Sequence, residues 1–321
     1  MTRPTLAIII PAYKAAFLRE AVESIARQTC KDFTLYVGDD ASKDDLEAII
    51  EPYKKDINIV FKRFENNVGG KDLVGQWERC LEMLGNEEWI WLFSDDDVMD
   101  ENCVELFYEH IEKHPRHNLL HFDFQTINEK GENLYKVRPF PKMSSSVELF
   151  DNILNHRVFS TVVEYIFRRE VFEKVNGFQR FDLAWASDNA TWMKIGLYGG
   201  IHTIDGALVK WRASGQNISS ISDSESIVNR KVNATIAYFN WAKQFFIENQ
   251  IEDTTTNIEK LKYIMTAVVY TSAINYNQKY QLIMSCLKDL NLENLRVASL
   301  ALWLSDETKK RIKTLIAYKG Y

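Results

Sequence analysis

Three consecutive aspartates, Asp95, Asp96 and Asp97, follow a short apolar stretch from Trp89 to Phe93 that predicts a buried strand. Clustered carboxylates repel one another unless a positive charge neutralises them. Oxygen ligands of this kind favour Mg²⁺ or Mn²⁺, and such an ion can bridge the two phosphates of a nucleotide diphosphate. The same run also fits a solvated acidic loop before the next helix. We therefore treat it as a candidate metal site with an ordinary structural alternative.

A second acidic pair, Asp39 and Asp40, follows the apolar stretch from Phe33 to Val37 and precedes Ser42. The carboxyl ends of neighbouring parallel strands share one edge of a sheet, so this pair is expected on the same edge as the three aspartates. An aspartate there can accept the ring N–H of a uracil base. The alternative is a strand-to-helix turn rich in Asp and Ser, which needs no ligand.

Two glycines, Gly69 and Gly70, lie between these acidic segments in the run Asn66 to Asp72 and open a predicted helix. Backbone N–H groups at such a turn, together with Lys71, can approach phosphate or sugar oxygens. The run matches neither the GxGxxG pattern nor a Walker loop, which argues against a dinucleotide oxidoreductase and an ATPase.

The elements that must position these residues alternate along the first half of the chain. Fully buried parallel strands read as continuous apolar stretches, and this pattern predicts an α/β fold whose ligands bind at the carboxyl ends of the strands. We expect strands over 5–10, 33–37, 57–64, 89–93, 119–124 and 162–167, a pair of short strands over 201–211 broken at Gly206, and helices over 17–28, 44–54, 72–84, 100–113 and 189–197. The spacing of apolar residues predicts further helices from about Glu225.

These motifs together resemble glycosyltransferase family 2, because they occur in the order and rough spacing typical of that family. The motifs that carry the likeness are Pro11-Ala12-Tyr13, Asp39-Asp40-Ala41-Ser42, Asn67-Val68-Gly69 and Asp95-Asp96-Asp97. It continues through Phe167-Arg168-Arg169, Asn176-Gly177-Phe178, Ala186-Ser187-Asp188-Asn189, Trp211-Arg212 and Asn217-Ile218-Ser219, and covers about residues 5 to 220.

The resemblance implies a GT-A fold, which is Rossmann-like with a mixed, mainly parallel sheet flanked by helices, and a C-terminal helical extension. We expect a catalytic domain over residues 1–222 and a helical region over 223–321. The implied activity is inverting transfer of a hexosyl or N-acetylhexosaminyl group from a nucleotide-sugar donor, with UDP-sugar as the preferred expectation. The implied acceptor is a hydroxyl of a glycan or lipid-linked molecule in surface polysaccharide synthesis, and the implied cofactor is Mn²⁺ or Mg²⁺.

Site residues follow from the resemblance position by position. Asp188 corresponds to the catalytic base, and Asp96 and Asp97 to metal ligands. The sequence departs from the family pattern at Ser94, where the first acid of Asp-x-Asp-Asp is usual, and at Ser187, where a Glu is usual. Donor contacts are expected from Pro11, Ala12, Tyr13, Asp39, Asn67, Gly69, Lys71, Asp72 and Asp95, and acceptor contacts from Trp185 and Arg212.

Composition limits the partners and the location. A net charge of -6 and a pI near 5.7 give no general attraction for nucleic acid. Four cysteines without CxxC spacing favour a reducing cytoplasm, and the apolar run Leu6 to Ile10 is too short for a membrane span. We expect His110, His114, His117 and His121 to be solvent-exposed rather than zinc ligands.

The C-terminal segment leaves two arrangements open. From Leu295 to Tyr321 an apolar stretch precedes the basic residues Lys309, Lys310, Arg311 and Lys313. Apolar and cationic groups together bind anionic lipid surfaces, so peripheral contact with the inner face of the cell membrane is one expectation. The other is a helix packed on the catalytic domain, and a homo-oligomer is also compatible with these helices.

Two other functional classes remain. A sugar nucleotidylyltransferase would need a glycine-rich, basic loop for a triphosphate, and the chain has none after Ile10. A non-catalytic scaffold that binds a nucleotide-sugar in a polysaccharide assembly complex is favoured by the serines at positions 94 and 187. Donor hydrolysis separates these classes, since a transferase releases some free sugar and a scaffold releases none.

Overall fold

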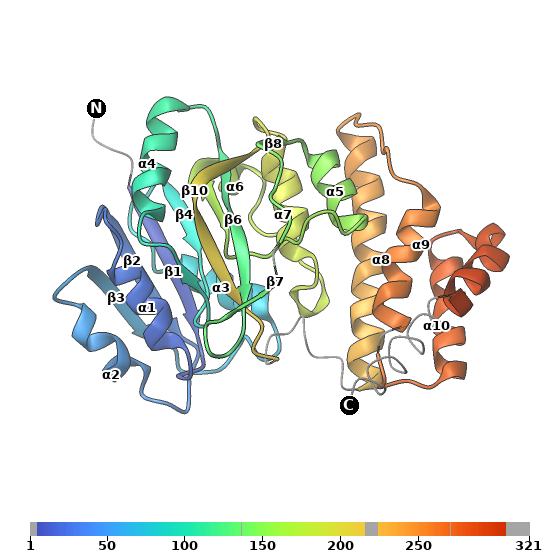
Figure 1. Ribbon diagram of the computed structural model, residues 1–321, viewed down its shortest axis with the longest axis horizontal. Helices are drawn as coiled ribbons and strands as arrows, with labels where there is room; N and C mark the ends of the chain where they lie inside the picture. The colour runs from blue at the N-terminus through green and yellow to red at the C-terminus, as the bar shows by residue number, and fades with distance from the viewer. Residues whose placement is uncertain (1–4, 136, 216–223, 270, 306–321) are drawn as a thin grey trace. The chain divides into compact units, whose positions relative to one another are not determined.

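The computed structural model describes residues 5–135, 137–215, 224–269 and 271–305 (Figure 1). These residues form two compact units. The first runs to Arg180 and resumes at Ser187 through the last strand, and the second takes residues 181–186 and the helices after that strand. The expected boundary at residues 222 and 223, the Asn217-Ile218-Ser219 motif and the basic run from Lys309 to Lys313 all lie outside the described residues.

The first unit is built on one mixed sheet. Among the described residues the strands follow the order β3-β2-β1-β4-β9-β6-β10-β5, with β7 beside β6 and β8 beside β10. The four longest ladders are parallel, and β9 is antiparallel to both of its neighbours. The strands are Leu6–Ala12 (β1), Phe33–Asp39 (β2), Asn58–Arg63 (β3), Trp89–Leu92 (β4), Val98–Met99 (β5), Leu119–Ile127 (β6), Asn133–Tyr135 (β7), Met143–Ser144 (β8), Tyr165–Arg168 (β9) and Ile201–Arg212 (β10).

Helices flank this sheet, so the predicted α/β class with a mixed sheet is confirmed. Helix α3 packs against β1 and β2, α4 against β10, and α7 against β6. The helices of the first unit are Leu18–Ala26 (α1), Leu46–Ile50 (α2), Leu73–Leu81 (α3), Cys103–Lys113 (α4), Ser146–Leu154 (α5), Arg169–Lys174 (α6) and Ser187–Gly196 (α7), with a 3₁₀ turn at Glu51–Tyr53.

The central strands are apolar along their whole length because both faces of the sheet are covered. Strand β4, Trp-Ile-Trp-Leu, is buried at every position, and β1 is buried from Leu6 to Ile10. Register then brings the strand ends together: Ala12 pairs with Asp39, and Asp39 with Arg63. The N–H of Phe93 donates to the carbonyl of Ile9 at 2.8 Å, so β4 ends on the same edge.

Two local expectations were wrong. The predicted pair of short strands over 201–211 is the single strand β10, whose register against β6 shifts between Ile204 and Leu208. Gly206 adopts a φ of 95° there, which lets the strand bulge instead of ending. No strand was expected over residues 125–146, but this segment contains the end of β6 and the short strands β7 and β8.

The second unit is helical. Its helices are Glu225–Glu248 (α8), Asn257–Val269 (α9) and Tyr276–Asp289 (α10), followed by a 3₁₀ turn at Glu293–Leu295 and by helical residues 296–305. Helices α8, α9 and α10 lie side by side (Figure 1). Residues of α9, α10 and the turn that follows α10 form a core of Leu261, Met265, Leu287 and Leu292. In the described part of the chain, none of the helices is both long enough and apolar enough to cross a bilayer.

Candidate active site

The loops after β1, β2 and β4 are joined directly to one another. The carboxylate of Asp95 accepts the backbone N–H groups of Tyr13 at 2.8 Å and Lys14 at 2.9 Å. The hydroxyl of Ser42 donates to the carbonyl of Tyr13 at 2.6 Å. The Pro11-Ala12-Tyr13 segment therefore lies between the two acidic segments, as their shared sheet edge requires.

Asp39 is fully buried at the end of β2, and its two carboxylate oxygens have different partners. One accepts the N–H of Ser42 at 2.7 Å, and the other pairs with Nη1 of Arg63 at 2.8 Å. Arg63 also donates to the Ser42 carbonyl at 2.5 Å. Arg63 was not among the expected site residues, although an arginine at the end of the third predicted strand could have indicated a partner for Asp39.

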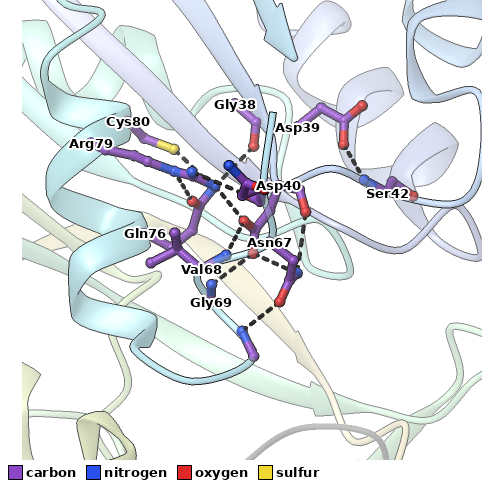
Figure 2. Close-up of polar contacts among 12 residues, drawn as sticks. Gly38, Asp39, Asp40, Ser42, Asn67, Val68, Gly69, Gln76, Arg79 and Cys80 are labelled. Atoms are coloured by element: carbon purple, nitrogen blue, oxygen red, sulfur yellow. Dashed lines mark hydrogen bonds and ion pairs between the residues drawn. The ribbon is translucent and has the colours of Figure 1, made fainter. Parts of the chain in front are cut away.

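Asp40 organises the glycine segment (Figure 2). Its carboxylate accepts the N–H groups of Val68 at 2.7 Å and Gly69 at 2.8 Å, and the side-chain amide of Asn67 at 2.9 Å. Gly70 donates its N–H to the side chain of Asn67 at 3.1 Å. Internal acceptors already use these N–H groups in this conformation, so the expected donor contacts of Asn67 and Gly69 stay predictions.

Lys71 and Asp72 lie at the start of α3. Lys71 is exposed, whereas Asp72 is the N-cap residue and accepts the N–H of Gly75 at 3.0 Å. Asp72 also forms an ion pair with Arg180. An N-cap carboxylate stabilises the first turn of a helix, so Asp72 has a structural role whether or not it contacts a donor.

The three aspartates lie after β4, and two of them are buried. Asp96 and Asp97 are 7% and 1% exposed. Ser94 donates its hydroxyl to Asp96 at 2.5 Å, and Asp97 accepts the N–H of Arg212 at 2.7 Å. Burial and the charge of Asp96 together raise the pKa of Asp95 to about 6. Burial and the same neighbouring charge also raise the pKa of Asp97 well above its usual range.

Arg212 supports this acidic segment from the interior. Its side chain has no exposed surface, and its Nε donates to the carbonyl of Asp96 at 2.8 Å. The rest of the guanidinium donates to the carbonyls of Asn128 and Glu129, both at 3.1 Å, and pairs with Glu20 at 2.6 Å. The expected contact between Arg212 and an acceptor would therefore require this network to open.

Asp188 lies in the first turn of α7 and accepts the N–H of Asn189 at 2.8 Å. Burial raises the pKa of Asp188 to about 6. A carboxyl group of this kind is ionised near neutral pH but is a stronger base than an ordinary aspartate, which suits proton abstraction.

Glu164 is a further buried acid, and it was not among the expected site residues. Its carboxylate has no exposed surface and accepts the N–H of Thr161 at 2.7 Å and the hydroxyl of the same residue. Burial and, to a smaller extent, the charge of Asp188 raise the pKa of Glu164 to about 7. Glu164 in turn raises the pKa of Asp97. The usable signal was a glutamate inside the apolar segment predicted as the strand 162–167.

Trp185 belongs to the second unit, in the short segment 181–186. Its indole N–H donates to the hydroxyl of Thr235 at 3.0 Å, and the ammonium of Lys231 lies 4.7 Å from the centre of its ring. Trp185 is thus held against α8, and its expected contact with an acceptor remains a prediction.

His110, His114 and His117 form a cluster with His202, in which His114 is exposed and His110 and His117 are half-buried. Nε2 of His110 lies 3.0 Å from Nδ1 of His117, and the His117 ring stacks on His202 with ring centres 3.4 Å apart. His121 is only 1% exposed and lies 3.0 Å from the hydroxyl of Thr203. The expectation of solvent exposure is therefore wrong for His121. No three His, Cys, Asp or Glu side chains of the described residues form a ready metal site.

Comparison with known proteins identifies the class and then the family. The described structure resembles the GT-A glycosyltransferase TarS of S. aureus, crystallised with UDP-GlcNAc, with a TM-score of 0.59 and 18% identity over 96% of this chain and 92% of that one. Residues 7–175, more than half of the chain, match the model of glycosyl transferase family 2, and the chain belongs to that family.

Two further matches are also distant in sequence. A Rickettsia prowazekii protein named as an uncharacterized glycosyltransferase is 27% identical over 215 residues, which cover 65% of this chain and 64% of that protein. The chain thus spans slightly less than two thirds of that relative. A mannosyltransferase of Pyrobaculum calidifontis, solved with GDP-Man and Mn²⁺, matches with a TM-score of 0.52 and 14% identity over 96% of this chain and 87% of that one.

Proposed function

We propose that this protein is an inverting, metal-dependent glycosyltransferase that moves a hexosyl or N-acetylhexosaminyl group from a UDP-sugar to a hydroxyl of a glycan or lipid-linked acceptor. The observation that carries the proposal is the direct linkage, at one sheet edge, of the segments containing Asp39, Asp95 and Tyr13 in a chain of family 2. The neighbouring acids Asp97, Glu164 and Asp188 interact electrostatically beside it.

The acidic segment fits a divalent cation that is shared with a diphosphate. Asp96 and Asp97 offer hard oxygen ligands, and burial beside other carboxylates makes their negative charge costly until a cation neutralises it. Mg²⁺ in nucleotide sites is usually held by one or two carboxylates together with substrate phosphates, so a complete protein cage is not required. We assign Asp96 and Asp97 as ligands of Mg²⁺ or Mn²⁺ and Asp95 to the donor side of the site.

Three groups of residues form or support the proposed donor site. Pro11, Ala12 and Tyr13 border the site beside Asp39, which accepts the ring N–H of uracil while its contacts with Ser42 and Arg63 hold the carboxylate in place. We assign the other border of the donor site to Asn67, Gly69, Lys71 and Asp72. Arg212 holds the carbonyl of Asp96, and we assign it to positioning the metal-binding segment rather than to contacting the acceptor.

Transfer is a single displacement. The ionised carboxylate of Asp188 removes the proton of the acceptor hydroxyl as that oxygen bonds to the anomeric carbon, while the bond from that carbon to the diphosphate oxygen breaks. Attack from the face opposite the leaving group inverts the configuration. A bound Mg²⁺ or Mn²⁺ would stabilise the negative charge on the departing diphosphate.

The relatives support a nucleotide-sugar donor without fixing the sugar. UDP-GlcNAc and GDP-Man occur in the two related structures, and Mn²⁺ in one of them. A Campylobacter jejuni relative, 29% identical over 97 residues, is named as a glucosyltransferase acting on an undecaprenol-linked glycan, which supports a lipid-linked acceptor in surface polysaccharide synthesis. We assign Trp185 to acceptor binding, and the division into a catalytic domain over residues 1–222 and a helical region over 223–321 stays a prediction.

Donor hydrolysis tests the proposal. Purified protein is incubated with a panel of UDP-, GDP- and dTDP-sugars with Mn²⁺, Mg²⁺ or EDTA, and the released nucleotide is measured by chromatography. We expect UDP from at least one UDP-sugar with metal and none with EDTA. The matched variants are Asp96→Asn, expected to be inactive, and Asp56→Asn, an exposed aspartate outside the site, expected to be unaffected. Donor binding without any turnover would favour the non-catalytic scaffold.

A further inference from the structure

One buried ion pair joins the end of β2 to helix α3 beside the glycine segment. Asp40 is 3% exposed, and its carboxylate pairs with the guanidinium of Arg79 from the last turn of α3. Taking two charges out of water is costly, and the attraction between them offsets the cost only when further hydrogen bonds use their remaining donors and acceptors. The backbone groups that bind the remaining donors and acceptors of Asp40 and Arg79 therefore indicate what this ion pair does.

Both partners of the pair hold the same short loop, residues 66–69. From one side the Asp40 carboxylate accepts the N–H groups of Val68 and Gly69 at 2.7 and 2.8 Å. From the other side Nη1 of Arg79 donates to the carbonyl of Asn66 at 3.0 Å. The loop is thus fixed at three consecutive peptide units by two charged groups that also neutralise each other (Figure 2).

The surroundings leave little freedom to either side chain. Nε of Arg79 donates to Gln76 at 2.5 Å, and the guanidinium lies 3.9 Å from the centre of the Phe64 ring. Gln76 also donates to the carbonyl of Gly38 at 3.2 Å, which links α3 to β2. On the loop itself a Cβ at Gly69 would lie 2.7 Å from the Asp40 carboxylate, so only glycine fits at that position without displacing the pair.

We propose that Asp40 and Arg79 form a positioning clamp that preorganises the 66–69 loop for the donor, and that donor affinity depends on this clamp although neither residue contacts the donor. The inference rests on the proposed function, because Asn67 and Gly69 are the donor contacts that the clamp would position. A loop already fixed in its bound shape loses less conformational freedom on binding, and this difference appears as tighter binding.

The variants are chosen to break the clamp from either side. Arg79→Met keeps the length of the side chain but removes the guanidinium, and Arg79→Lys keeps a charge but loses the planar set of donors that reaches Asn66, Gln76 and Asp40 together. Asp40→Asn keeps the shape and removes the charge. Arg27→Met is the matched control, since Arg27 forms an exposed ion pair with Glu23 in α1 away from the loop.

Two measurements together decide the proposal. Hydrogen exchange at the amides of Val68 and Gly69, measured without any donor, should accelerate at least tenfold in the clamp variants and remain unchanged in the control. The Kd for UDP with Mn²⁺ should rise on the order of tenfold to a hundredfold, while kcat at saturating donor changes less than about threefold. If Arg79→Met does not fold, as judged by its melting curve, Arg79→Lys carries the test.

Each other outcome overturns the proposal in a recognisable way. Unchanged exchange in a folded variant would show that the pair does not fix the loop. Faster exchange with unchanged UDP affinity would show that the loop is clamped for stability alone. If the wild-type protein binds no nucleotide while hydrogen exchange at Val68 and Gly69 accelerates in the clamp variants, the proposed function is wrong. The pair then fixes the loop but does not act in donor binding.

Discussion

Replacing the buried Glu164 by glutamine should stabilise the protein at neutral and alkaline pH and leave it unchanged at acidic pH. Glu164 has no exposed surface, and burial raises its pKa from 4.5 to about 7. Glutamine resembles the protonated acid, since it can accept the N–H of Thr161 and donate to the hydroxyl of the same residue. The substitution therefore removes a buried charge while keeping both contacts.

The size of the effect follows from the two pKa values. Each pH unit that separates the folded from the unfolded pKa is worth about 1.4 kcal/mol, so the folded state of the wild type loses about 3 kcal/mol relative to the Gln variant once Glu164 ionises. The folded pKa of this acid is raised, so its favourable contribution is complete below pH 4.5 and is lost as pH rises to about 7. The difference should be near zero at pH 4 and full at pH 8.

Urea denaturation of wild type and Glu164→Gln at pH 4, 6 and 8, in EDTA to remove metal, measures this difference directly. Glu112→Gln, which changes an exposed glutamate in α4, is the control and should stay within about 0.5 kcal/mol at every pH. Equal stability of Glu164→Gln and wild type at pH 8 would refute the reasoning, because it would mean that the Glu164 carboxylate ionises in the folded protein as easily as in water.

Three further predictions concern the base, the loop and the histidines. Asp188→Asn should lower turnover by at least about a hundredfold with little change in the Kd for UDP, and wild-type turnover should fall below about pH 6 as Asp188 is protonated. A retained rate in Asp188→Asn would assign the base elsewhere. Gly69→Ala should weaken UDP binding because the new methyl group meets the Asp40 carboxylate, and unchanged UDP affinity by calorimetry would contradict this. His121 should stay neutral down to about pH 4 because burial lowers its pKa, so its contribution to stability is lost as pH falls from 6.5 toward 4; a side-chain NMR titration near 6.5 would contradict this.

The fold was predictable where continuous apolar stretches alternate with segments whose apolar residues recur at helical spacing. Strand β4 and strand β1 read as buried on both faces, and that is how the structure uses them. Short edge strands such as β5 and β8 were not predictable, because two residues carry no period and their pairing with β10 depends on distant segments. Gly206 was expected to break the strand but forms a bulge. A glycine inside a strand is compatible with either arrangement, so the sequence does not distinguish them.

The acidic segments could be selected from sequence because they follow apolar strands. Their partners could not, since Arg63, Arg79 and Arg212 meet their carboxylates or carbonyls through contacts between residues 24 to 116 positions apart. Glu164 was missed because an acid in an apolar segment carries no sign of which neighbours it will face. The N–H groups of the glycine segment were assigned to phosphate because sequence does not show that Asp40 already accepts them.

The most direct test of the central claim is calorimetric titration of UDP into the wild type and into Asp96→Asn, each with Mn²⁺ and with EDTA. Cooperation between the aspartate segment, a cation and a diphosphate predicts binding to the wild type with Mn²⁺, and at least tenfold weaker binding when either the metal or the Asp96 carboxylate is removed. Binding of UDP with equal affinity in all four titrations would contradict it.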